Sequence, residues 1–159
     1  LIEEGCEKLA YIGGSLELDL LSNQRYRVFK ENVEAAGFSV KNYQCQLDSF
    51  DRKEYQKLAS QIFSKNQEID GIFASSDLIA AAIIKEADKN RIRVPEDLKV
   101  IGYDDIDLGE LYSPEITTIR QPTAEIAQKA VKLLIKEING KEIKKKNILD
   151  VKLIVRNSA

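Results

Sequence analysis

Apolar and polar residues follow two different periods along this chain. Short, nearly continuous apolar runs are typical of strands buried on both faces, and they alternate with longer segments in which apolar residues recur at helical spacing. The runs predict strands over residues 8–12, 39–44, 71–74, 98–103, 116–119 and 148–155. The longer segments predict helices over residues 23–36, 51–65, 77–90 and 123–139. This alternation predicts an α/β fold with a doubly wound, mostly parallel sheet flanked by helices.

Turn and cap residues support these boundaries. Gly37 and Gly140 follow predicted helices directly, as C-terminal glycines do. Ser76 or Asp77 is expected to cap the helix that follows residue 74, because both side chains accept hydrogen bonds from free backbone amides. For Asp77 we expect this capping role rather than contact with a ligand.

Composition narrows the classes of function. The 159 residues are 43% hydrophobic with a net charge of −2, which fits one globular domain without a strongly basic nucleic-acid surface. The absence of histidine excludes a Ser-His-Asp triad, and the separated Cys6 and Cys45 do not have the spacing of a zinc site. Two lone cysteines favour a reducing, cytoplasmic location, and no apolar run predicts a membrane span. Because the chain starts at Leu1 and lacks methionine, we expect further sequence upstream.

Three carboxylates follow the predicted strand at 98–103. Asp104, Asp105 and Asp107 lie where parallel strands open toward a ligand. From the residues alone, three interpretations stay open: a hard-cation site, a polar loop, or a carboxylate that accepts hydrogen bonds from sugar hydroxyls. Gly13-Gly14-Ser15 has neither the dinucleotide spacing nor a lysine-serine pair, so it is interpreted as a tight turn rather than a phosphate loop.

The most informative motifs are Val-Pro-Glu-Asp-Leu-Lys-Val-Ile-Gly-Tyr-Asp-Asp at 94–105 and Ser-Pro-Glu-Ile-Thr-Thr-Ile-Arg-Gln-Pro at 113–122. In order and spacing they resemble the sugar-responsive repressors of the LacI/GalR family, and the resemblance extends over nearly the whole chain. It implies a two-lobed, periplasmic-binding-protein-like sensor preceded by a helix-turn-helix. On this basis residues 1–159 are a partial effector-binding domain, its C-terminal lobe. The return helix at 123–139 would pack in a first lobe that is missing here, and the DNA-binding domain is absent.

The resemblance also implies which residues contact the effector. It aligns Arg25, rather than Arg27, with the family's ligand-binding arginine, although Val28 replaces the glycine usual three positions later. It places Asp104 in the pocket, and Ser76 at a position that is often asparagine. Gln121 lies at the crossover between lobes, and Phe50 lies near an aromatic residue that stacks on the sugar. For Phe50 a core position is equally compatible with the sequence.

Assembly is the last expectation. The resemblance implies a homodimer, with Tyr112, Leu111 and Ala81 at the interface. The helix at 123–139 carries a broad apolar surface, so we expect it to pack against its own lobe, meet another chain or be mobile.

Together these expectations describe the effector-sensing part of a transcriptional regulator without catalytic residues, cofactor or metal. The resemblance implies that this regulator is a repressor. Its partners would be a sugar or sugar phosphate, a second copy of the chain, and operator DNA through the missing domain, with no membrane contact. A transporter's extracytoplasmic sugar-binding protein is the alternative. A carbohydrate-active enzyme is the third, but such enzymes need two opposed carboxylates, whereas the sequence offers one acidic loop.

Overall fold

The computed structural model describes residues 1–14, 20–44, 52–65 and 68–159, which form the α/β fold that the sequence predicts. Its centre is a six-stranded sheet in the order β2-β1-β3-β4-β5-β6. All neighbouring strands run parallel except β5 and β6, which are antiparallel. The strands are β1 (Leu9–Gly13), β2 (Val40–Gln44), β3 (Gly71–Ala74), β4 (Lys99–Asp104), β5 (Thr117–Arg120) and β6 (Lys152–Ile154).

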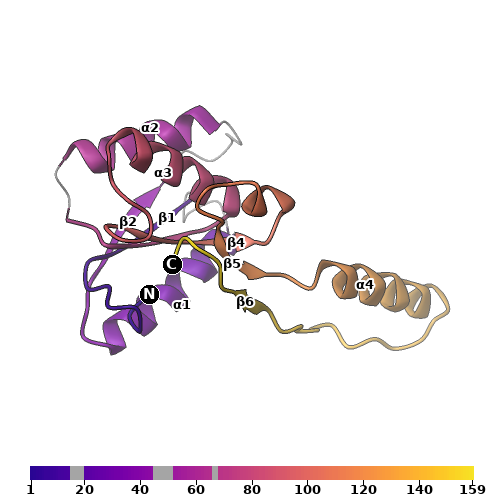
Figure 1. Ribbon diagram of the computed structural model, residues 1–159. Helices are drawn as coiled ribbons and strands as arrows, with labels where there is room; N and C mark the ends of the chain where they lie inside the picture. Colours follow the sequence, from indigo (N-terminus) through magenta and orange to yellow (C-terminus); the bar gives the residue numbers. More distant parts are fainter. Residues whose placement is uncertain (15–19, 45–51, 66–67) are drawn as a thin grey trace.

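Helices cover both faces of the sheet, as in a doubly wound fold (Figure 1). One face carries α1 (Leu20–Ala35), and the other carries α2 (Arg52–Ser64) and α3 (Asp77–Lys89), which pack side by side. A short 3-10 helix, η1 (Asp107–Glu110), follows β4, and α4 (Thr123–Ile138) follows β5.

The larger core lies between the sheet and the α2–α3 layer. Ile72 of β3 and Val100 of β4 are fully buried there against apolar residues of α3 such as Ile83. Strand alternation sends the other side chains of β4 to the opposite face, where Ile101 and Tyr103 are half-buried. One face of β4 therefore lies in the larger core, and the other face is only partly covered.

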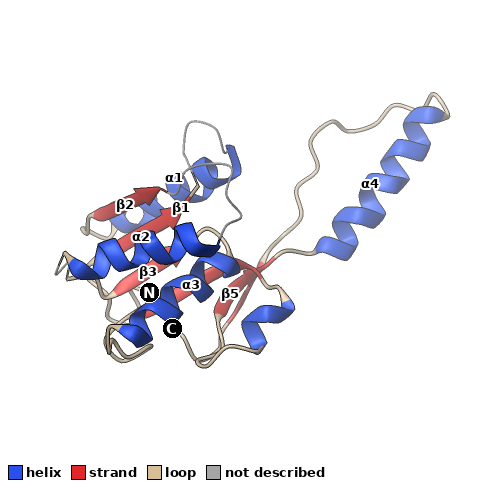
Figure 2. Cartoon of the chain, turned by 90° about the horizontal axis from the view of Figure 1, so that it is seen from above, coloured by secondary structure: helices blue, strands red, loops and turns tan. Residues whose placement is uncertain are grey.

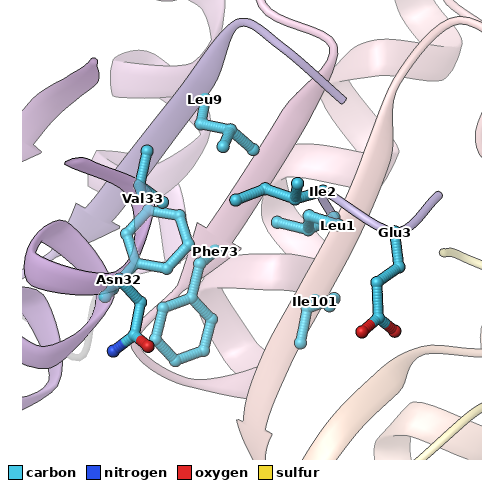
Figure 3. A pocket seen from close by; sticks show the side chains of 9 residues that line it. Leu1, Ile2, Glu3, Leu9, Asn32, Val33, Phe73 and Ile101 are labelled. Carbon is cyan, nitrogen blue, oxygen red and sulfur yellow. The ribbon is translucent and has the colours of Figure 1, made fainter. Parts of the chain in front are cut away.

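On the α1 face, a smaller apolar cluster leaves a hollow of about 330 Å³ (Figure 3). Phe73 and Ile101 of the sheet line it, and Leu1 and Ile2 lie across its edge. These first residues form a turn in which the amide of Cys6 donates to the carbonyl of Leu1 at 3.1 Å. The turn thus holds two apolar side chains against a part of the sheet that α1 does not reach.

The segment between β5 and β6 leaves the body of the molecule. Figure 2 shows α4 standing away from the sheet, with a long loop returning from its far end. No residue of α4 is buried, and Val131, Leu134 and Ile138 are among its exposed apolar side chains. Of the three alternatives expected for this helix, packing against its own lobe is not observed, since no residue of α4 is buried. Contact with another chain and mobility stay predictions. Its apolar face remains available to another lobe or another chain.

Candidate functional site

The candidate site lies where β4 and β5 end, next to the start of α3. Arg25 reaches this edge from α1 on one face of the sheet. Asp104 is the last residue of β4, and Gln121 follows the last residue of β5. The parallel register of β4 and β5 pairs Asp104 with Arg120, so Gln121 lies one position beyond the last paired residues. Residues far apart in sequence meet here because parallel strands present their carboxyl ends at one edge.

Three contacts hold the Arg25 guanidinium. Nη1 donates to the carbonyl of Ser75 at 2.6 Å, and Nη2 lies 3.8 Å from Oδ1 of Asp104. The guanidinium carbon also lies 3.7 Å from the centre of the Tyr103 ring, a cation–π contact. With 19% of its side chain exposed, Arg25 is mostly buried but still reaches solvent. A cation fixed in this way is ready to donate to an oxygen-rich ligand.

Asp104 connects Arg25 to Gln121. Oδ1 of Asp104 accepts a hydrogen bond of 2.7 Å from Nε2 of Gln121, and the side chain stays 33% exposed. Asp104 has a φ of 111° and Asp105 a φ of 57°, which non-glycine residues rarely adopt. The backbone therefore departs from the strand conformation at these two residues, the Asp104–Asp105 turn, and the two adjacent carboxylates bind different partners.

Asp105 forms an ion-pair cluster separate from the contacts of Asp104. Its carboxylate pairs with Arg120 at the end of β5 and, at 2.8 Å, with Arg156 after β6. Arg156 also donates to the carbonyl of Ile116 and to Glu110. Burial opposes ionisation of Asp105, but the hydrogen bonds from both arginines outweigh it and lower its pKa. This cluster fixes both chain segments that lead to and from α4.

Ser76, rather than Asp77, is the N-cap of α3. The Ser76 hydroxyl accepts from the amide of Ile79 at 3.4 Å. The prediction of a capping role for Asp77 is wrong, because its side chain is fully buried and faces β4 and β5. Ser76 is half-buried and lies next to Ser75, whose carbonyl binds Arg25.

Asp77 is an interior residue, a position that was not predicted from the sequence. Its Oδ1 accepts from the Thr118 hydroxyl at 2.6 Å, and its Oδ2 accepts from the amide of Ile106 at 2.9 Å. Burial raises its pKa, and the nearby charge of Asp104 acts in the same direction, against the lowering effect of the hydrogen bonds. No local pattern could reveal this role, because Thr118 is 41 residues away in sequence.

Tyr103 was also missed, although strand alternation could have found it. Tyr103 shares a face of β4 with Ile101, toward α1, where it lies beneath Arg25 and contacts Phe73. Of the predicted contact residues, the structure thus brings Arg25, Asp104 and Gln121 into one connected group. Phe50 lies outside the described residues.

The residues expected at a dimer interface have different environments. Leu111 is 81% exposed, and Tyr112 is half-buried against the α3 core. Ala81 is only 2% exposed and lies inside that core, so its expected position at an interface is corrected: it offers no surface of its own to a partner. Its small side chain instead permits close packing of α3.

Two kinds of structural feature are absent from the described ranges. No group of three or more histidine, cysteine, aspartate or glutamate side chains there is arranged to hold a metal ion. None of the helices in that part of the chain has the length and apolar character needed to cross a bilayer.

Comparison with known proteins defines the class. The family model for the periplasmic binding protein-like domain matches residues 1–159. The ribose operon repressor of Halalkalibacterium halodurans is 36% identical over 99% of this chain, and the repressor CytR of Escherichia coli is 30% identical over 99%. The matches cover 47% and 46% of those proteins, so the chain spans about half the length of its curated relatives.

Solved structures agree with this classification. A LacI-type regulator from Alkaliphilus metalliredigens, complexed with D-xylulofuranose, has a TM-score of 0.85 at 30% identity, covering 99% of this chain and 58% of that one. The regulator CelR in its cellobiose complex has a TM-score of 0.87 at 28% identity, covering 100% and 49%. The chain belongs to the periplasmic binding protein-like domain family, within the group formed by the LacI-type transcriptional regulators. The resemblance inferred from residues 94–105 and 113–122 is thereby confirmed.

Proposed function

We propose that this chain is the effector-sensing C-terminal lobe of a LacI-family transcriptional repressor that binds a sugar or sugar phosphate. The observation that carries the proposal is the connected group of Arg25, Asp104 and Gln121 at the open edge of the sheet. A guanidinium donates to hydroxyl or phosphate oxygens, and a carboxylate accepts from vicinal hydroxyls. Because both groups are only partly buried, a polyol can exchange for the solvent at this edge.

The relatives support the class of ligand. The similar proteins include a ribose operon repressor and regulators in complex with cellobiose and D-xylulofuranose. All three sugars carry several hydroxyl groups, which match the donors and acceptors of the site. Ser76 adds a hydroxyl beside this group, and Phe50 is proposed to stack on the sugar ring. We assign binding rather than catalysis to these residues.

The proposal includes parts outside this chain. Residues 123–139 would pack within a first lobe, and the exposed apolar face of α4 supports this arrangement. A DNA-binding domain upstream would contact operator DNA in a cytoplasmic homodimer, with Leu111 and Tyr112 near the dimer interface. Effector binding would change the relative positions of the lobes and shift operator affinity by a coupling free energy of about 1–3 kcal/mol.

A thermal-shift screen on the intact regulator tests this function. The panel contains D-ribose, cellobiose, D-xylulose and the 5-phosphates of the two pentoses. We expect at least one of them to raise the melting temperature and to change the affinity for DNA taken from upstream of the regulator's own gene. A stabilising sugar that leaves DNA affinity unchanged would contradict the regulatory role and favour a sugar-binding protein of a transporter. No stabilisation by any of these sugars would count against this class of effector.

A further inference from the structure

Asp77 occupies an unusual place for a carboxylate. It is the first residue of α3, fully buried, and its two oxygens bind groups from two other parts of the chain. Oδ1 accepts from the Thr118 hydroxyl on β5, and Oδ2 accepts from the amide of Ile106 beyond β4. Buried carboxylates are unfavourable unless hydrogen-bonded, so these bonds are needed for Asp77 to remain inside the protein.

The bond to Ile106 fixes the end of the strained turn. Ile106 immediately follows Asp104 and Asp105, the two consecutive residues with positive φ. Such conformations persist only where surrounding contacts hold them. Asp105 is held on one side by Arg120 and Arg156, while Asp77 holds the backbone directly after the turn.

We propose that Asp77 is a positioning residue for the effector site: its carboxylate holds the Asp104–Asp105 turn so that Asp104 faces Arg25 and Gln121. This inference rests on the proposed function, because it gives Asp77 a role in the same sugar site without contact with the sugar. If the amide of Ile106 is released, the turn can relax toward ordinary backbone angles. The carboxylate of Asp104 then moves away from Nε2 of Gln121, now 2.7 Å from it.

Gly102 of β4 also supports this role of Asp77. Its missing side chain leaves the space in which Oδ1 of Asp77 lies. The carboxylate therefore lies beside β4 and β5, where it accepts from the amide of Ile106. The site depends on a residue that never contacts the effector.

Asp77→Ala in the intact regulator tests the proposal, because alanine removes both acceptor oxygens and leaves the Ile106 amide without its partner. Asparagine is unsuitable, since its oxygen can keep the Ile106 amide while its amide nitrogen donates to the Thr118 hydroxyl. The readouts are hydrogen exchange at the Ile106 amide and the NMR resonances of the Gln121 side-chain amide. We expect Ile106 exchange to accelerate by about tenfold or more, while the core amide of Val100 stays protected. The Gln121 resonances should move toward those of an Asp104→Ala variant.

Thr118→Val is the matched control. It removes the other hydrogen bond of Asp77 but leaves the bond to Ile106, so both readouts should stay near wild type even if stability falls. Unchanged Gln121 resonances in Asp77→Ala, or an equal shift in Thr118→Val, would overturn the positioning role. If Asp77→Ala does not fold, Asp77→Ser is used, because serine suits the start of a helix and admits water; the same outcomes decide.

Calorimetry with D-ribose separates this proposal from the function on which it rests. Both NMR readouts need no sugar, so they decide the role of Asp77 by themselves. If wild type binds D-ribose, we expect Asp77→Ala to weaken binding severalfold and Thr118→Val to leave it unchanged. Loss of D-ribose binding in Arg25→Ala but not in Asp77→Ala would retain the proposed function and reject the positioning role. Unchanged binding in Arg25→Ala, with the expected NMR shifts, would reject the effector site and retain the structural link.

Discussion

A β-carbon on Gly102 would lie 2.2 Å from Oδ1 of Asp77, so the glycine provides the space for the buried carboxylate. We predict that Gly102→Ala lowers the free energy of unfolding by about 1–3 kcal/mol, because the methyl group overpacks this site. Gly109→Ala is the control, since its nearest neighbour would be 3.7 Å away, an ordinary contact. Denaturant unfolding of both variants checks this. Equal stability losses would contradict the steric account.

The two arginines bound to Asp105 should contribute unequally to stability. The side chain of Arg156 is 8% exposed and that of Arg120 is 51% exposed. Arg156→Ala removes the buried partner of Asp105 and the donor to the Ile116 carbonyl, and leaves Asp105 with Arg120 alone, so we expect a loss of about 3 kcal/mol. Arg120→Ala should cost less than about 1 kcal/mol, because half of the Arg120 side chain is exposed to solvent and Asp105 keeps Arg156. Chemical unfolding of both variants measures these losses. A larger loss in Arg120→Ala than in Arg156→Ala would refute the unequal contributions.

The same cluster predicts a pH dependence. The pKa of Asp105 is lowered from its ordinary value of 3.8, so its ionised form stabilises the folded state above that pH. This stabilisation is lost as pH falls through the folded-state pKa. We therefore expect Asp105→Asn to be less stable than wild type near neutral pH, with a difference that shrinks below about pH 4. Thermal unfolding of both proteins as a function of pH measures this, and a constant difference would argue against an ionised Asp105.

Tyr103 should act on effector binding through its ring rather than its hydroxyl. Removing the ring in Tyr103→Leu abolishes the contact with Arg25 and should weaken sugar binding by about 0.5–1 kcal/mol. Tyr103→Phe keeps the ring and should bind as wild type does. Titration calorimetry compares them, and a loss in Tyr103→Phe equal to that in Tyr103→Leu would indicate a role for the hydroxyl instead.

The strands and helices were predictable because their apolar periods are local. The strand predicted at 98–103 is observed one residue later, at Lys99–Asp104. The last strand was predicted over 148–155 but is confined to Lys152–Ile154, since it pairs only with the short β5 at the edge of the sheet. An apolar pattern does not show how long the neighbouring strand is.

The site was predictable only in part. Arg25, Asp104 and Gln121 came from the family resemblance, since nothing local distinguishes Arg25 from Arg27. In the structure Nε of Arg27 instead lies 3.7 Å from Oε1 of Glu31, on the exposed side of α1. Asp77 was misjudged because its burial depends on distant residues, Gly102 and Thr118. The propensity of a residue to cap a helix depends on its neighbours in sequence. It therefore does not predict the hydrogen-bond partners that other strands supply.

The most direct test of the account is titration calorimetry on the intact regulator with the sugar that stabilises it most. Arg25→Ala and Asp104→Ala should each lose about 1–3 kcal/mol of binding free energy, because partner groups are left unsatisfied. Asp107→Ala should bind as wild type does, since Asp107 is exposed at the start of η1. DNA binding without sugar should survive in all three variants. Equal losses in all three, or none in Arg25→Ala and Asp104→Ala, would show that the effector binds elsewhere.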